Sequence, residues 1–367
     1  AIGTNALAAN TTGANNTAVG ENVMAANTEG VNNVALGYIA LDADTLGFQS
    51  TALGYAALSA QNFTSSTPSQ NVAVGYYAGV SVTTGVNNTL IGAHAGDALT
   101  DADNNVAFGY QSLGADTLGS ESTALGKGTL TAQNFTSATD THNTAVGYQS
   151  GNDITVGVKN TLLGSRSGDA LTDADENVGI GYATLSGDTL GSKSVAVGSG
   201  ALEVQNFTSA TDAYNTAVGY QSGNDITTGT RNTIMGSLGG DALTEGGNNL
   251  VLGWNALGAD TKGSRSVALG YSALTTQNFT SATNAYNVAV GFQAGNAVTT
   301  GLTNTLVGSL CHDNLTTGDL NVALGYDTRP SAVGVDSEIV IGNSVTGAGT
   351  NTVRIGTAGG TATLGLD

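Results

Sequence analysis

Apolar and polar residues alternate in short segments that recur along the whole chain. A five-residue motif, Asn-[Thr/Val]-Ala-[Val/Leu/Ile]-Gly, stands for example at 33–37 and at 143–147. An alternation of this kind is typical of a β-strand, because the apolar positions of a helix recur about every 3.6 residues. We therefore expect each copy of the motif to form one short strand.

The motif glycine recurs at steps of 17, 17, 17 and 21 residues, which together make a block of 72. The marker Gln-Asn-Phe-Thr repeats with the same block and begins at Gln61, Gln133, Gln205 and Gln277. A fixed short period is the signature of a solenoid, in which each coil stacks on its neighbours. The sequence predicts an all-β, parallel β-solenoid of about 20 coils over residues 1–342, with 343–367 as terminal coils that lead to a missing C-terminal region. At ~4.8 Å per coil the array would be a rod on the order of 100 Å long.

The two faces of the predicted strand differ in side-chain size. The residue before the glycine is apolar in each coil, so we expect this position to line the core, as at Val19, Leu36 and Met235. The other face carries mostly alanine and then glycine, as in Ala145 and Gly147, and is nearly bare. Glycine in a strand lets another backbone approach closely, so we expect a second subunit to pack on this face.

Two further columns of residues follow from stacking the coils. Asparagine stands four residues before most motif glycines, as at Asn33, and stacked amides would bond to one another in a ladder. Serine replaces it in the coil that leads into each 21-residue step, at Ser50, Ser122, Ser194 and Ser266. Aromatic residues recur just after the glycine and predict a stack at the coil corner that includes Tyr38, Tyr55, Tyr76, Tyr110, Trp254, Tyr271, Phe292 and Tyr326.

The charge of the chain excludes several classes of partner. Nine Lys and Arg stand against 28 Asp and Glu, and the resulting net charge of −19 would repel nucleic acid and anionic membrane surfaces. No apolar run approaches the ~18 residues of a membrane span, so we predict no membrane insertion. The one cysteine, Cys311, leaves no intramolecular disulfide. The chain begins inside a motif, at residues 1–3, which indicates a piece of a longer polypeptide.

Acidic residues cluster in one coil of several blocks, at Asp97, Asp101 and Asp103 and again at Asp169, Asp173, Asp175 and Glu176. Calcium requires several oxygen ligands that converge on one point. The nonapeptide of calcium-binding β-rolls is absent from this sequence. We therefore interpret the clusters as solvated acidic turns and predict no metal and no cofactor.

Two candidate catalytic arrangements fail on repetition. A hydrolase with paired carboxylates needs one unique site, whereas most acidic residues here recur at 72-residue spacing. The sequence Cys311-His312-Asp313 places a thiol beside a base. However, it aligns with an earlier turn in which Gly239 and Asp241 hold the first and third places. We predict no catalytic residues.

The 21-residue coil adds a polar loop that is our candidate for contact with a partner, receptor or glycan. Its candidate residues are Asn62, Phe63, Asn134, Phe135, Asn206, Phe207, Asn278 and Phe279. Each Asn-Phe-Thr is formally an N-glycosylation sequon, as are the sites at Asn10, Asn15, Asn87 and Asn314. Such matches are expected in a chain rich in Asn and Thr, so we favour a structural loop, with each phenylalanine packing against a neighbouring chain.

The motif at 33–37 and 143–147 resembles the head repeat of YadA-like trimeric autotransporter adhesins, and similar repeats occur in phage tail fibres. The resemblance covers nearly the whole chain, although the coils are longer than the usual head coil. It implies a left-handed β-roll and close association of three chains along their axis. Residues 329–356 look like the segment that precedes a C-terminal chaperone domain in phage fibres.

These observations predict a non-enzymatic fibre that is extracellular, on a cell surface or on a virion. We expect a homotrimer that presents a repetitive surface to a host cell or glycan receptor. The alternative is a filament or matrix protein joined end to end, with or without glycans; a polysaccharide depolymerase is a weaker one. An ice-binding solenoid is also weak, because its threonine column would be interrupted, as in the run Thr17, Val34, Thr51, Val72.

Overall fold

A computed structural model describes residues 1–358 and 360–361 and shows an all-β chain with no helix in that part. The chain is a parallel β-solenoid of about 20 turns, with coils about 17 residues apart, which confirms the predicted fold class. It divides into two compact units, Ala1–Ala183 and Thr184–Asp367, which are described separately below.

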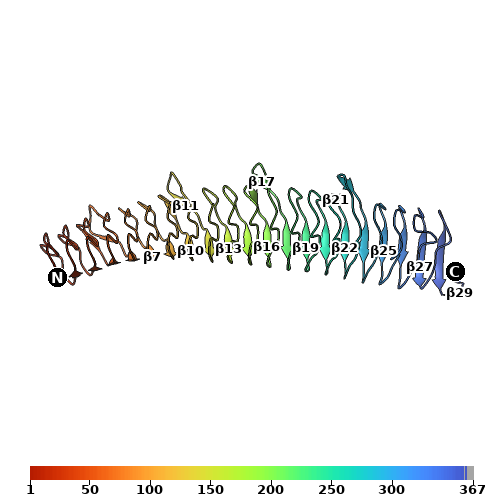
Figure 1. Ribbon diagram of the computed structural model, residues 1–367, viewed down its shortest axis with the longest axis horizontal. Coiled ribbons are helices and arrows are strands. Elements are labelled where there is room, and N and C mark those ends of the chain that lie inside the picture. Colours follow the sequence, from red (N-terminus) through yellow and green to blue (C-terminus); the bar gives the residue numbers. More distant parts are fainter. Residues whose placement is uncertain (359, 362–367) are drawn as a thin grey trace, which may run out of the picture. The chain divides into compact units, whose positions relative to one another are not determined.

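In the first unit, each coil contributes one strand to a parallel sheet, and the strands lie side by side in chain order (Figure 1). Neighbouring strands are in register, so that Thr17 pairs with Val34 and equivalent residues form columns. The strands are β1 (Thr17–Val19), β2 (Val34–Leu36), β4 (Thr51–Leu53), β6 (Val72–Val74), β7 (Thr89–Ile91), β8 (Val106–Phe108), β10 (Thr123–Leu125), β12 (Thr144–Val146), β13 (Thr161–Leu163) and β14 (Val178–Ile180).

The second unit repeats this arrangement and ends with longer strands. Its parallel strands are β16 (Val195–Val197), β18 (Thr216–Val218), β19 (Thr233–Met235), β20 (Leu250–Leu252), β22 (Val267–Leu269), β24 (Val288–Val290), β25 (Thr305–Val307), β26 (Val322–Leu324), β27 (Ile339–Asn343) and β28 (Val353–Thr357). A short strand, β29 (Gly360–Thr361), pairs antiparallel with β28. Residues 343–357 thus continue the array as a shorter coil; residues 359 and 362–367 lie outside the described residues.

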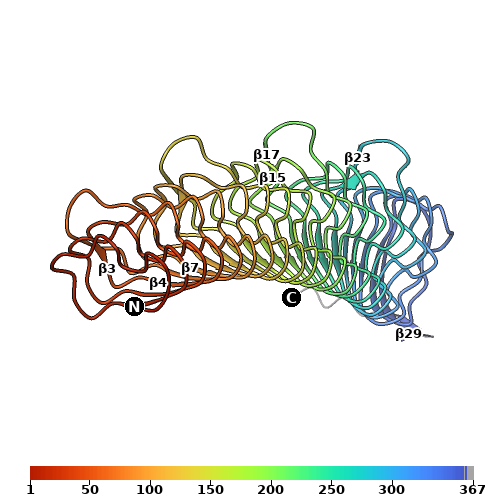
Figure 2. The same cartoon turned by 60° about the vertical axis from the view of Figure 1, so that its left-hand side comes forward.

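Each 21-residue coil also forms a small two-stranded parallel sheet with the coil before it. In the first unit β3 (Gly47–Phe48) pairs with β5 (Thr67–Pro68), and β9 (Gly119–Ser120) pairs with β11 (Thr139–Asp140). In the second unit β15 (Gly191–Ser192) pairs with β17 (Thr211–Asp212), and β21 (Gly263–Ser264) pairs with β23 (Thr283–Asn284). The additional residues form loops that extend beyond the neighbouring coils (Figure 2).

The motif glycines are required by the close stacking of coils within one chain. Gly37 has a φ of +143°, and a Cβ atom there would lie 2.2 Å from the carbonyl oxygen of Gly54 in the next coil. No side chain fits into that space. The prediction that glycine admits another backbone is therefore right, but that backbone is the next coil and not a second subunit.

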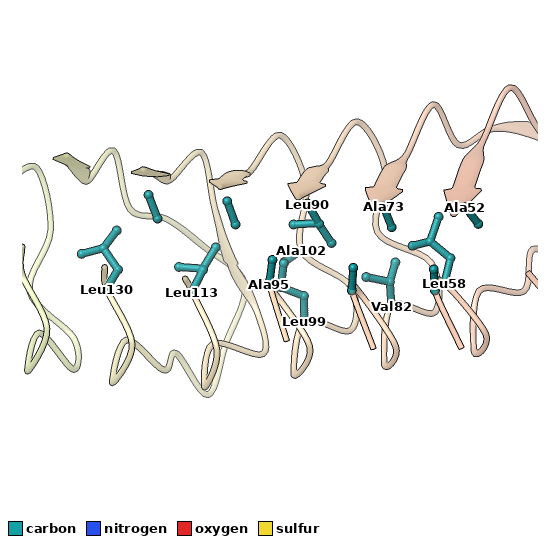
Figure 3. Packing of buried hydrophobic residues seen from close by; sticks show 14 of the residues in the cluster. Ala52, Leu58, Ala73, Val82, Leu90, Ala95, Leu99, Ala102, Leu113 and Leu130 are labelled. Carbon is teal, nitrogen blue, oxygen red and sulfur yellow. The ribbon is translucent and has the colours of Figure 1, made fainter. Parts of the chain in front are cut away.

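The predicted orientation of the strands is wrong, because the alanine lines the core and the large apolar residue faces outward. Ala35 is fully buried, whereas Leu36 is 49% exposed. Figure 3 shows Ala52 and Ala73 pointing from their strands into the interior. The opposite wall of the coil fills that interior with larger side chains such as Leu58, so only a small residue fits beneath the strand.

The predicted asparagine ladder is confirmed. The backbone N–H of Asn88 donates to Oδ1 of Asn71 in the coil before, at 2.8 Å, and Nδ2 of Asn88 donates to the carbonyl oxygen of Ala102 at 2.7 Å. The same bonds recur at Asn160 and Asn304. Each buried amide thus satisfies backbone groups of its neighbouring coils, which a solenoid corner would otherwise leave unpaired.

The predicted aromatic stacks are also present. In the first unit the rings of Tyr38 and Tyr55 are stacked with centroids 5.3 Å apart, and Tyr76 continues the stack at the same spacing. In the second unit Trp254 and Tyr271 are stacked at 4.8 Å. These rings lie at the edge of the outward sheet face and remain about half exposed.

Candidate functional site

The outward face of the main sheet carries a row of large apolar side chains, which we call the apolar row. It consists of the residue before each motif glycine. In the first unit Leu36, Phe108 and Leu163 are 49%, 55% and 46% exposed. In the second unit Met235 and Leu324 are 46% and 49% exposed. Single exposed apolar residues are ordinary, but a continuous row marks an interaction surface.

The four loop phenylalanines are buried in their own chain. Phe63, Phe135, Phe207 and Phe279 are only 4%, 6%, 5% and 6% exposed. The ring of Phe63 lies over Gly47, where an added Cβ atom would be 2.8 Å from Cδ2 of the ring. The expectation that these rings pack against a neighbouring chain is therefore wrong, because each ring fills a space made by a glycine of the preceding coil.

The loop asparagines lie apart from the phenylalanine rings, on the surface of the same loops. Asn62 is exposed, and its Oδ1 accepts a hydrogen bond of 3.0 Å from Oγ1 of Thr45. The same bond to a threonine of the preceding coil recurs at Asn134, Asn206 and Asn278. Their use by a receptor or a glycan stays a prediction.

The glutamine of the repeated marker belongs to a buried polar network that the sequence analysis missed. Gln133 is fully buried, and its Nε2 donates to Oδ2 of Asp116 at 2.5 Å and to Oγ of Ser122 at 2.9 Å. Its Oε1 accepts from Nδ2 of Asn143 at 2.9 Å. Gln133 thus joins the serine that interrupts the asparagine ladder to the asparagine that resumes it.

A buried aspartate anchors each copy of this network. Burial raises the pKa of Asp44, Asp188 and Asp260, while hydrogen bonds from the glutamine amide and from backbone N–H groups lower it in part. These carboxyl groups accept hydrogen bonds within one coil and its neighbour, so they stabilise the wide coil. A signal was present in the sequence, because an aspartate precedes each marker glutamine by 17 residues.

The acidic clusters are mostly turn acceptors. Oδ1 of Asp103 accepts from the backbone N–H of Val86 at 2.7 Å, and Oδ1 of Asp101 accepts from Oγ1 of Thr84 at 2.6 Å. Within the described part of the chain, no group of three or more His, Cys, Asp or Glu residues is placed to hold a metal ion.

The second unit also has a small polar hollow of about 150 Å³, lined by Gln221, Asn224, Asp225, Asp241 and Ala242. Burial raises the pKa of Asp241, and the nearby charge of Asp225 adds to the shift. Oδ1 of Asp241 is buried without a hydrogen-bond partner.

The thiol and imidazole of Cys311 and His312 are both buried in the core of the second unit. Burial raises the pKa of Cys311 to about 11, and its Sγ accepts from Oγ1 of Thr328 at 3.1 Å. Burial lowers the pKa of His312 to about 4, and its Nδ1 lies 3.3 Å from the carbonyl oxygen of Thr328. Both groups are therefore neutral at pH 7 and contact Thr328.

No helix of the described residues has the length and apolar character to cross a membrane. No family model matches the chain, and comparisons with curated proteins and with solved structures also find no match.

Proposed function

We propose that this chain is a non-enzymatic fibre protein that associates with copies of itself through the apolar row, as a homotrimer. The fibre would present its loops and remaining surface to a host cell or glycan receptor. Such a protein would act outside the cell, on a cell surface or on a virion.

The observation that carries the proposal is the orientation of each strand. In every coil the small alanine faces the core and the larger Val, Leu, Ile, Phe or Met faces outward, as at Ala107 and Phe108. This arrangement leaves apolar area in water along the whole sheet. Burial of such area contributes roughly 25 cal/mol per Å², so association along the row would be favourable and would grow with the number of coils.

The number of chains and the location rest on the resemblance alone. The repeat is similar to the heads of YadA-like trimeric adhesins and to phage tail-fibre repeats, and in that family three chains associate along the axis. A trimer also suits a long flat row, because three such rows can meet around one axis without a free apolar edge.

Cysteine cross-linking tests the proposal. In a Cys311→Ser background, Leu163→Cys places a thiol in the apolar row, and Thr136→Cys places a matched thiol in an exposed loop. We expect mild oxidation to give covalent dimers of the Leu163→Cys chain and to leave the Thr136→Cys chain monomeric. Equal cross-linking of both variants, or of neither, would contradict association through the apolar row.

A further inference from the structure

The residue five places before each motif glycine forms an exposed column beside the main sheet, which we call the corner column. Its backbone is left-handed in coil after coil, with φ of +60° at Asn32 and +59° at Arg231. This conformation favours asparagine over most side chains. Asparagine does occur there, but six consecutive coils of the second unit carry Lys193, Tyr214, Arg231, Asn248, Arg265 and Tyr286.

These side chains are not needed by the fold. The first unit holds the neutral amides Gln49, Gln70 and Asn87 at the equivalent places, 72 or 144 residues earlier. Basic and aromatic residues therefore occupy the column of the second unit against the preference of the backbone, and a functional reason is expected where such a preference is overridden.

Positive charge is concentrated here in a chain that is otherwise acidic. Three of the nine Lys and Arg residues of the chain lie in this part of the corner column. Nζ of Lys193 contacts the exposed carboxylate of Asp212 at 2.7 Å. In the described structure no carboxylate lies within ion-pair distance of Arg231 or Arg265, so their charges are available to a ligand.

In the first unit the same column neutralises its own charges. Nδ1 of His142 lies 2.9 Å from the carboxylate of Glu121, and Nζ of Lys159 lies 3.7 Å from that of Glu176. The excess of cations is thus particular to the second unit.

Tyrosine rings lie between the cations and support them. Nζ of Lys193 lies 5.5 Å from the ring centroid of Tyr214, and Cζ of Arg231 lies 6.0 Å from the same centroid. Cζ of Arg265 lies 5.5 Å from the ring of Tyr286 and donates through Nη1 to the hydroxyl of that ring. Cation–π contacts of this kind hold the charged groups in place, and both rings remain about half exposed.

The order along the column alternates between a cation and a neutral planar group. Lys193, Arg231 and Arg265 stand on every second coil, and at ~4.8 Å per coil they repeat at ~10 Å. This repeat is close to the length of one disaccharide in an extended polysaccharide. Neutral Tyr214 and Asn248 stand on the coils between them.

We propose that the corner column of the second unit binds a linear polysaccharide in which acidic and neutral sugars alternate. The acidic groups would pair with Lys193, Arg231 and Arg265, and the neutral sugars would lie against the tyrosine rings and Asn248. A nucleic acid fits less well, because it carries a charge on every nucleotide and is repelled by the net charge of −19. The proposal deepens the proposed function by naming a receptor class, but the experiment below measures binding and not assembly, so the two can fail separately.

The test is binding of the full chain to immobilised hyaluronan, whose acidic and neutral sugars alternate, at low ionic strength. The variant Lys193→Gln/Arg231→Asn/Arg265→Gln uses residues that the chain itself carries at the equivalent places of its first block. The control Lys127→Ser/Lys159→Asn/Lys262→Gln removes the same charge elsewhere. We expect the first variant to bind at least ~10-fold more weakly, the control to bind as the unchanged chain does, and added salt to weaken binding.

A substitution of opposite sign separates recognition from damage to the fold. Asp212 partly neutralises Lys193, and the next block carries Asn284 at its place, so Asp212→Asn should strengthen binding to hyaluronan. The proposal would be overturned if the unchanged chain did not bind hyaluronan, or if both triple variants lost binding equally. Equal binding to neutral dextran would also overturn it, and tighter binding to DNA would favour a nucleic-acid partner instead.

Discussion

Leu90 occupies the space that a side chain on Gly79 would need. A Cβ atom on Gly79 would lie 2.7 Å from Cδ1 of Leu90, although the φ of +57° at Gly79 is the same left-handed conformation that Leu113 adopts at its place two coils later. The backbone therefore accepts either residue. Where the column holds leucine, as at Leu113, the strand of the same coil carries an alanine, Ala107.

This complementarity predicts strong coupling between Gly79 and Leu90. Gly79→Ala should destabilise the fold by about 1–3 kcal/mol through overpacking, and Leu90→Ala should destabilise it by about 2–5 kcal/mol through the cavity it leaves. The double variant should lose less stability than the sum of the two, because each change relieves the other. Denaturation of the four chains in urea measures the coupling, and strict additivity would contradict the packing described.

The orientation of the strands predicts opposite tolerance at two adjacent positions. Ala107 is fully buried, and Phe108 is 55% exposed on the outward face. Ala107→Leu should destabilise the fold by about 1–3 kcal/mol, whereas Phe108→Leu should change the free energy of unfolding by less than about 0.5 kcal/mol. The midpoint of thermal unfolding distinguishes them, and a larger loss at Phe108 would reverse the assignment.

The repeat predicted the fold class because a period of 17 residues with alternating strands permits few architectures. It could not decide which strand face lies inside, since the larger apolar face is buried in an ordinary sheet. Here residues four or seven places after the glycine, such as Leu58 and Val82, already fill the narrow interior. Their presence was a sequence signal that the core had another source of large side chains.

For the loops, the sequence gave the position and not the direction of the side chains. Phe63 points into its own coil because Gly47 in the preceding coil leaves room for the ring, and that contact joins residues of two different coils. The partner of Gln61 likewise lies in another coil, at Asp44. Such pairings become visible only when the coils are stacked in register.

The buried network predicts that the marker glutamine is structural. Gln133→Leu would leave the carboxylate of Asp116 and the amide of Asn143 each without one buried hydrogen-bond partner, so the free energy of unfolding should fall by about 2–5 kcal/mol. The nearby exposed change Thr136→Ala, which removes the sequon, should have almost no effect. Chemical denaturation at pH 7 measures both, and equal effects would show that the network contributes little.

His312 predicts a pH dependence of stability. Burial lowers its pKa from 6.5 to about 4, so the unfolded chain binds more protons than the folded chain between these values. The stability due to neutral His312 is complete above pH 6.5 and is lost as the pH falls towards 4, by an amount on the order of 3 kcal/mol. Leucine occupies the equivalent place in other coils, as at Leu202, so His312→Leu should remove this dependence.

The comparison of the two chains isolates His312 from groups that act in the opposite direction. The raised pKa values of Asp188 and Asp260 make the folded state bind protons more readily, so these groups favour folding as the pH falls. Both chains share them. Urea midpoints at pH 7.5 and pH 4.5 should differ between the two chains only at the lower pH, and parallel curves would contradict a buried neutral imidazole.

The central claim is self-association through the apolar row, and the mass of the unmodified chain in solution tests it most directly. Light scattering over a range of concentrations should give a concentration-independent mass of three times 36.2 kDa. A mass that rises with concentration would favour the end-to-end filament. A mass of 36.2 kDa at all concentrations would contradict the claim and make the apolar row a property of a single-chain solenoid.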